Sequence, residues 1–137
     1  MASTARRVDY FYTTVKAGPD EAYELLTHLA SLGINFLALT SVPIGPASIQ
    51  LTLFPEDPHK LQSVAKQANL VLDGPYPAVL VQGDDEIGAL ARIHDRLHAY
   101  HVDVYASNAV TDGRGYFGYV LYVRPGDADK AAQALRG

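Results

Sequence analysis

The feature that most constrains the fold of this chain is an internal repeat. Residues 19–36 read PDEAYELLTHLASLGINF, and residues 87–104 read IGALARIHDRLHAYHVDV. An offset of 68 positions places Leu29 on Leu97 and keeps the apolar positions in step. This period is longer than the roughly 20–50 residues of solenoid and propeller units, and it fits a small domain.

A second stretch repeats in the same order. Residues 49–57 (IQLTLFPED) align with residues 119–127 (YVLYVRPGD) at an offset of 70. We therefore interpret the chain as two copies of one module, residues 1–74 and residues 75–137. Modules this small bury only a modest share of their surface. We expect them to be joined side by side or paired with a second chain.

Hydrophobic periodicity predicts the same order of elements in both copies. In the first copy we predict strands at 8–15, 35–42, 48–54 and 70–72, with helices at 21–32 and 59–69. In the second copy we predict strands at 78–82, 102–110 and 116–123, with helices at 88–100 and 128–135. The residues DGPYP at 73–77 predict a turn between the two copies. The fold class is α+β, with two ferredoxin-like βαββαβ modules of which the second lacks its last strand.

The absent strand has a consequence for residues 78–82, which would then lie at an open sheet edge. An open edge of apolar residues pairs readily with another chain. Two interpretations follow: either a strand from a second chain pairs with this edge, or the edge strand is too short to pair with other chains.

Composition limits the possible partners. The chain has 137 residues, a net charge of −4 and no cysteine, and its only adjacent basic pair is Arg6 and Arg7. These features disfavour nucleic acid as a partner and exclude disulfides and thiol nucleophiles. The start, MASTARR, lacks the apolar stretch of a signal peptide, and no run approaches the roughly 18 apolar residues of a membrane span. We expect a soluble, cytoplasmic protein that does not bind membranes.

Catalytic and metal-binding patterns are weak. His94, His98 and His101 share a helical stretch, but the apolar positions turn them toward solvent, so we predict no metal site. His28 or His59 could act as a base, yet neither has a partner in the sequence. Alternating tyrosines on strands could stack bases, although packing against another chain fits the acidic composition better.

The second copy of the repeat resembles the ACT-domain pattern of a strand, a short loop, a helix and a strand opening with asparagine. Gly88 and Asp103 are 15 positions apart, the separation of the loop glycine and the asparagine in that family. In the first copy Asn35 matches the asparagine, but Asp20 replaces the glycine. Ile87 and Asp103 replace the family's proline and asparagine in the second copy. The resemblance covers residues 8–135, nearly the whole chain.

This resemblance implies a non-catalytic, allosteric regulatory protein that binds a small amino acid between two modules and needs no cofactor. In the family, modules pair through their second strands, which here would join residues 35–42 to residues 102–110. The implied partners are a second copy of the chain, as a homodimer, and a regulated enzyme or regulator on another chain. The implied main site consists of Asp84, Asp85, Glu86, Ile87, Gly88 and Asn35, and a weaker second site of Ala17, Gly18, Asp20 and Asp103.

Such a main site makes chemical sense. A helix start offers N–H groups and a positive dipole end to a carboxylate, and Gly88 lets the backbone approach a ligand. Asp85 could receive an ammonium group, and Asn35 could both donate and accept. Asp20 would repel a ligand carboxylate, and its side chain could itself accept hydrogen bonds from the N–H groups at the start of its helix.

The same residues also allow a plain structural interpretation. Gly88 would permit a tight turn, Asp84 or Asp85 would cap the helix, and Asn35 would satisfy backbone groups at a strand start. Two other functions remain open at this point: an interaction module without a ligand, and an enzyme of the ferredoxin-like dimer type.

Overall fold

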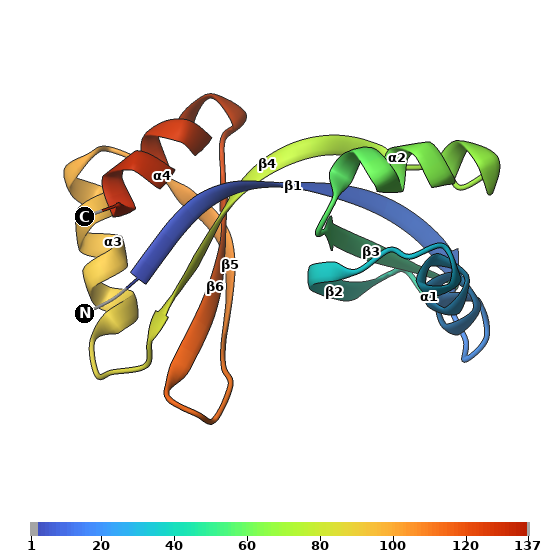
Figure 1. The fold of residues 1–137 in the computed structure, drawn as a ribbon, viewed down its shortest axis with the longest axis horizontal. Coiled ribbons are helices and arrows are strands. Elements are labelled where there is room, and N and C mark those ends of the chain that lie inside the picture. The colour runs from blue at the N-terminus through green and yellow to red at the C-terminus, as the bar shows by residue number, and fades with distance from the viewer. Residues whose placement is uncertain (1–2, 137) are drawn as a thin grey trace. The chain divides into compact units, whose positions relative to one another are not determined.

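The structure, a computed structural model, describes residues 3–136 (Figure 1). The elements in chain order are β1 (Ser3–Lys16), α1 (Glu21–Ser31), β2 (Phe36–Ile44), β3 (Ser48–Pro55), α2 (Pro58–Gln67), β4 (Asp73–Asp84), α3 (Ala89–Ala99), β5 (Val104–Thr111), β6 (Tyr116–Val123), a short 3₁₀ helix (Pro125–Asp127) and α4 (Ala128–Leu135). They form two compact units. Asp9–Tyr76 form the continuous unit, and Met1–Val8 with Pro77–Gly137 form the split unit.

Six strands form one sheet in the order β2-β3-β1-β4-β6-β5. Four neighbouring pairs are antiparallel: β1 with β3, β2 with β3, β4 with β6 and β5 with β6. The α+β class and the ferredoxin-like modules predicted from the sequence are confirmed. Among residues 3–136, no strand follows α4.

The continuous unit packs α1 and α2 against β1 and β3. Phe11, Leu29, Leu53 and Leu61 are fully buried in its core. The helix α1 ends where Gly33 adopts a left-handed conformation (φ +81°), as the glycine at this position predicts. At the start of α2, the Asp57 carboxylate accepts a hydrogen bond from the backbone N–H of Lys60 at 3.2 Å.

The split unit packs α3 and α4 against β4 and β6 (Figure 1). Leu121 and Ala128 are fully buried, and Leu97 of α3 is 1% exposed. Small alanine side chains on α4 allow this helix to lie close to its neighbours, and the Arg96 Nε donates to the carbonyl oxygen of Ala134 at 2.8 Å. The two helices are thereby tied together.

The start of the chain supplies the strand that the second module lacks. Residues 3–8 belong to the split unit, where Ala5 is only 6% exposed and lies in the core. The Arg136 Nε donates to the carbonyl oxygen of Ala5 at 3.2 Å. Since β4 lies between β1 and β6, it has no open edge. The predicted open edge at 78–82 was therefore wrong, and no second chain is needed to cover it.

The strand predicted at 70–72 and the turn predicted at 73–77 were also wrong. Residues 70–72 have no regular structure, and β4 begins at Asp73 and runs unbroken to Asp84. Gly74 permits this because it adopts φ +140°, a conformation that side chains rarely allow, and a Cβ there would lie 2.8 Å from the carbonyl oxygen of Tyr10. The Gly-Pro pair thus lies within a strand.

Both ends of the sheet are free edges within the chain. The strands β2 and β5 occupy these edges, at opposite ends of the strand order. The predicted pairing of 35–42 with 102–110 inside one chain therefore does not form. Each edge exposes apolar side chains: Leu39, Val42 and Ile44 on β2, and Tyr105 and Val110 on β5.

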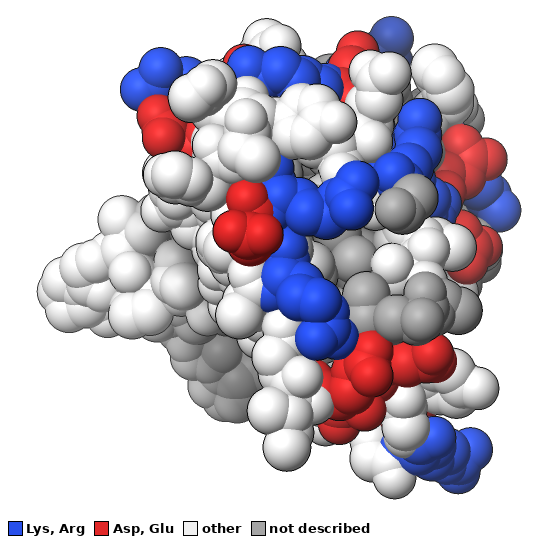
Figure 2. All heavy atoms as spheres, turned by 90° about the vertical axis from the view of Figure 1, so that its left-hand side faces the viewer, with Lys and Arg blue, Asp and Glu red and all other residues white. Residues whose placement is uncertain are grey.

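Charges of both signs are mixed on the surface. On the face shown in Figure 2, Lys and Arg side chains form a band across the middle, and Asp and Glu lie beside it. Within residues 3–136, no helix is long and apolar enough to span a membrane.

Candidate functional site

The loop that connects β4 to α3 holds most of the predicted main site, and it is fixed by contacts within the split unit. The backbone N–H of Asp85 donates to the carbonyl oxygen of Gly115 at 2.8 Å, which ties the loop to the β5–β6 hairpin. Glu86 forms an ion pair with Arg92 of α3 at 3.0 Å. Ile87 is fully exposed. The loop therefore has a defined shape with an apolar side chain at its tip.

Gly88 occupies the N-cap position of α3 and adopts a left-handed conformation (φ +85°). Glycine is the residue that takes this conformation without strain. It brings no side-chain oxygen to the first turn, so it leaves the N–H groups of Leu90 and Ala91 without the acceptor that Ser, Thr or Asp would supply. The helix start is thus open to an external acceptor such as a carboxylate.

A groove of about 430 Å³ lies beside this helix start, between α3 and the β5–β6 strands. Its residues are Asp85, Glu86, Gly88, Ala89, Leu90, Ala91, Ala109, Val110, Thr111 and Phe117. The lining is mostly apolar, and it includes the two acidic residues Asp85 and Glu86. The side chain of Asp85 has no hydrogen-bond or ion-pair partner among the described residues. The groove is within the range of small-molecule sites, which hold about 300–1,000 Å³.

The same loop in the continuous unit is built differently. Asp20 is the N-cap of α1 but has helical backbone angles, and its side chain makes no capping hydrogen bond. The prediction that Asp20 satisfies its own helix start was therefore wrong. The backbone N–H of Ala17 donates to Ala47 at 2.9 Å, and Gly18 has open space around it. Asp103, the other member of this weaker site, lies in the split unit, 4.0 Å from Arg124.

Asn35 belongs to the continuous unit. Its side-chain Nδ2 donates to the Glu56 carboxylate at 3.3 Å, and its carbonyl oxygen accepts from the backbone N–H of Glu56 at 2.9 Å. These two bonds fix Asn35 at the start of β2. Its role beside a ligand stays a prediction, and because β2 and β5 do not pair within the chain, that role calls for a second copy.

The three histidines are exposed, and among residues 3–136 no group of three or more His, Asp or Glu side chains is placed to hold a metal. His94 has a contact that the sequence did not predict. Its Nε2 lies 2.6 Å from the hydroxyl of Tyr119, which donates to Ser107 at 3.1 Å. The alternation on β6 places Tyr119 on the helix side of the sheet, but nothing in the sequence indicates which helix residue meets it.

The tyrosines of β1 are packed rather than bare. Tyr10 is 3% exposed, and its ring lies 5.1 Å from that of Phe54 and 5.7 Å from that of Tyr76. Tyr76 donates a hydrogen bond of 2.6 Å to Asp73, and this bond raises the pKa of the Tyr76 hydroxyl. The continuous unit therefore offers no bare aromatic surface on Tyr10 for stacking bases.

Comparisons with known proteins place the chain by its fold. No protein-family model matches it, and no curated protein matches it. Among solved structures it is similar to protein BT0572 from Bacteroides thetaiotaomicron (TM-score 0.77, 21% identity, 96% of this chain and 88% of that one). It is also similar to the regulatory subunit of aspartate kinase from Thermus thermophilus (TM-score 0.67, 11% identity, 98% and 95%). A third likeness is to the aspartokinase alpha and beta subunits (TM-score 0.58, 14% identity, 98% and 95%). Identities this low show the fold alone, so the resemblance to ACT domains is supported at the level of the fold.

Proposed function

We propose that this protein is a non-catalytic regulatory protein that binds a small amino acid in the groove at the start of α3. The observation that carries the proposal is the open start of α3 at Gly88, which lines a mostly apolar groove together with Asp85 and Glu86. The likeness of the fold to a regulatory subunit of aspartate kinase adds support.

Each part of an amino acid has a suitable counterpart in this groove. The ligand carboxylate would accept from the N–H groups of Leu90 and Ala91, assisted by the positive end of the helix dipole. Its ammonium would lie against Asp85, which has no other partner among the described residues. Its side chain would pack against Val110 and Phe117. Such a ligand satisfies charge at both ends without any change in the core.

Regulation would follow from the position of the groove beside β5. Ala109, Val110 and Thr111 belong both to the groove and to a free sheet edge. A ligand that favours one state of this edge shifts binding of a partner by its difference in affinity for the two states. We infer that the partner includes a second copy, whose β2 edge would pair with β5 and bring Asn35 toward the 84–88 loop.

A second candidate function is an interaction module that has kept the fold without the ligand. The exposed apolar side chains on both edges favour it, because such edges bind other chains with or without a small molecule. The two functions differ in one respect: only the first predicts stabilisation by an amino acid.

The test is a thermal-shift screen of the full chain against the twenty amino acids, followed by calorimetry on any hit. A ligand at 100 times its Kd stabilises the folded state by about 2.7 kcal/mol, a shift of several degrees for a chain of this size. Gly88→Val is expected to abolish the shift because its side chain fills the ligand's approach to the helix start.

Gly113→Val is the matched control. Gly113 also has a positive φ (+74°), but it lies in the β5–β6 turn and does not line the groove. Both variants place a side chain on a backbone with a positive φ, so a ligand shift lost only in Gly88→Val points to a site at Gly88. Equal ligand shifts in the two variants would rule out this site, and no shift with any amino acid would favour the interaction module.

A further inference from the structure

Three polar side chains in the split unit form a hydrogen-bonded chain between α3 and the free edge of the sheet. The Nε2 of His94 on α3 lies 2.6 Å from the hydroxyl of Tyr119 on β6. The same hydroxyl lies 3.1 Å from the Oγ of Ser107 on β5, which is the edge strand. None of the three residues lines the groove at α3, so this chain is separate from the proposed amino-acid site.

The middle of the chain is buried and both of its ends are exposed. Tyr119 is 5% exposed, whereas His94 and Ser107 are exposed residues. A buried hydroxyl has to find its hydrogen bonds within the protein. The Tyr119 hydroxyl therefore depends on His94 and Ser107 together, and a change at one end of the chain is felt at the other.

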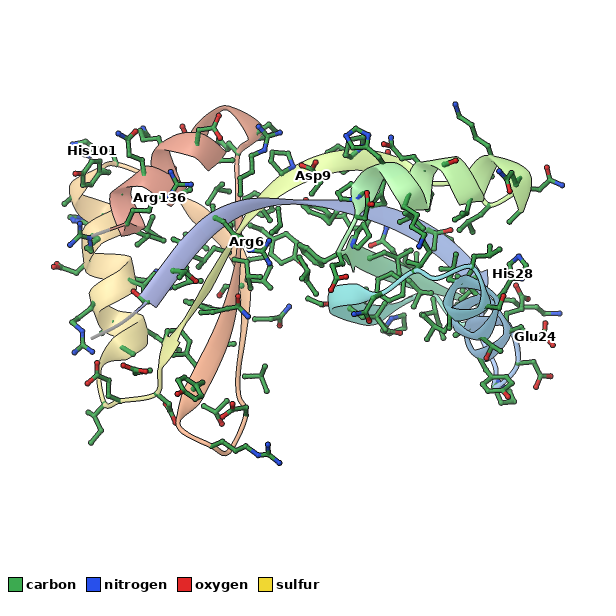
Figure 3. All side chains as sticks on the ribbon, viewed as in Figure 1. Arg6, Asp9, Glu24, His28, His101 and Arg136 are labelled. Atoms are coloured by element: carbon green, nitrogen blue, oxygen red, sulfur yellow. The ribbon has the colours of Figure 1, made fainter. Side chains whose placement is uncertain are left out.

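The other two histidines of this region make no such link. The side chains of His98 and His101 have no hydrogen bond or ion pair with the described residues. His98 lies one turn after His94 on α3, and His101 lies beyond the end of that helix (Figure 3). His98 is therefore a matched control for His94, because it belongs to the same helix and makes no contact with Tyr119.

Two arrangements of the hydrogens fit these distances. A tyrosine hydroxyl carries one hydrogen and donates it to one neighbour at a time. When Tyr119 donates to Ser107, the hydrogen between Tyr119 and His94 has to come from Nε2 of His94. When Nε2 is bare, Tyr119 donates to it, and Ser107 donates to Tyr119. A doubly protonated imidazole allows only the first arrangement, since both of its nitrogens are donors.

The short bond favours the second arrangement for the neutral imidazole. Its 2.6 Å is below the range of about 2.7–3.2 Å for N–H···O bonds and within the range of about 2.5–3.0 Å for O–H···O bonds. This length fits a hydroxyl donor and a bare Nε2. Protonation of His94 would then reverse the whole chain of hydrogen bonds.

Few charges surround His94. The strands β5 and β6 contain no Asp, Glu, Lys or Arg, and β4 has carboxylates only at its two ends. On α4, Asp129 and Lys130 form ion pairs with other residues. On α3, Asp95 follows His94 directly and His98 lies one turn away. Tyr119 is thus the titratable side chain that the sheet brings to His94.

We propose that the chain of His94, Tyr119 and Ser107 is a proton-sensitive switch that sets what Ser107 offers at the β5 edge. With neutral His94, Ser107 gives its hydrogen to Tyr119 and offers only acceptor electron pairs outward. When His94 takes up a proton from solvent, the Tyr119 hydrogen turns toward Ser107, and the Ser107 hydrogen turns outward as a donor. Histidine is the side chain whose charge ordinarily changes between about pH 5 and pH 8, so the switch would act in that interval.

The effect on a partner rests on the proposed function, in which a second copy pairs with β5. A donor and an acceptor at Ser107 suit different groups on the partner strand. One hydrogen bond made or lost changes an affinity by about two- to tenfold. We therefore expect the dissociation constant for self-association to differ by this factor between pH 5.5 and pH 8.

Nuclear magnetic resonance of the ¹⁵N- and ¹³C-labelled full chain tests the switch without any partner. At pH 8 we expect the hydrogen of neutral His94 on Nδ1 and a bare Nε2. As the pH falls to 5.5, the Ser107 resonances should move with the same midpoint as His94. In Tyr119→Phe, which lacks the connecting hydroxyl, His94 should still titrate and Ser107 should no longer follow it. A hydrogen on Nε2 of neutral His94, or Ser107 resonances that ignore His94, would overturn the proposal.

Sedimentation of the full chain at pH 5.5 and pH 8 tests the effect on self-association. The difference between the two pH values should be lost in His94→Gln and Tyr119→Phe and kept in His98→Gln, which removes an equivalent imidazole. Loss of the difference in His98→Gln as well would point to net charge and refute the effect on the edge.

Failure of this inference can be told apart from failure of the proposed function. A chain that self-associates equally at both pH values contradicts only the switch at β5. A chain that never self-associates contradicts the second-copy partner, and the resonances of His94 and Ser107 then decide on the switch by themselves.

Discussion

Replacing Ala5 by Asp tests whether the start of the chain belongs to the core of the split unit. Ala5 is 6% exposed and lies in that core, so the new carboxylate must lose its water. A carboxyl group with an ordinary pKa of about 3.9 is neutralised at pH 7 at a cost of about 4 kcal/mol, from about 3.1 pKa units at 1.36 kcal/mol each. The expected loss of stability is about 4 kcal/mol, or the free energy of detaching residues 3–8 from β4 if that is smaller.

Thr4→Asp is the matched control, because Thr4 is the exposed neighbour of Ala5 on the other face of the strand. A surface substitution of this kind changes stability by about 0.5 kcal/mol or less. Urea unfolding followed by circular dichroism measures both variants at pH 7. Hydrogen exchange adds a local measurement, since the β4 amides should lose protection in Ala5→Asp and keep it in Thr4→Asp.

The pH dependence sharpens the test. Burial raises the folded-state pKa of the introduced carboxyl above its unfolded value, so the destabilisation of Ala5→Asp should be small below pH 4 and should grow as the pH rises toward 7. Equal stability of the two variants at pH 7 would mean that residue 5 is not buried against β4, and it would refute the assignment of residues 3–8 to this core.

Two further substitutions test β4 and its neighbours. Gly74→Ala is expected to lower the free energy of unfolding in urea by about 2 kcal/mol, because φ is +140° and the new Cβ would lie 2.8 Å from the Tyr10 carbonyl oxygen. Gly118→Ala is the control, since Gly118 has open space and an ordinary φ, and its stability should hardly change. An unchanged stability of Gly74→Ala would contradict the backbone conformation described for Gly74. Tyr76→Phe removes the bond to Asp73 that raises the Tyr76 pKa from 10.0. Wild-type protein should therefore be more stable than Tyr76→Phe below pH 10 and should lose this advantage as the pH rises through the raised pKa; an advantage that persists once the Tyr76 hydroxyl has ionised would show that the bond is not its source.

The sequence predicts most of this fold because its signals are local. The apolar positions of α1 and α3 recur at helical spacing, and the boundaries predicted for β6 and α4 agree with the structure. Residues 3–7 escaped prediction because STARR carries a single apolar side chain, Ala5, and its burial depends on β4, which lies some 70 positions along the chain.

The errors around β4 have a related cause. Gly and Pro are usually signs of a turn, so DGPYP at 73–77 predicted a break. Whether a chain turns there depends on the neighbouring strand, and Gly74 fits against Tyr10 in an extended chain. The same limit applies to the sites. Gly88 could be singled out from the repeat, whereas the groove wall at Val110 depends on contacts between distant segments.

The pairing of Ala5 with Arg136 also determines when each unit can form during synthesis. The continuous unit, Asp9–Tyr76, is one uninterrupted stretch and can fold once it has left the ribosome. The split unit needs two separate segments, because residues 3–8 lie beside β4 and the Arg136 Nε donates to the carbonyl oxygen of Ala5. Residues 3–8 are synthesised before the continuous unit, and they have to wait for α4 before the split unit is complete. The order of synthesis therefore sets the order of folding: the continuous unit can be complete before the split unit forms.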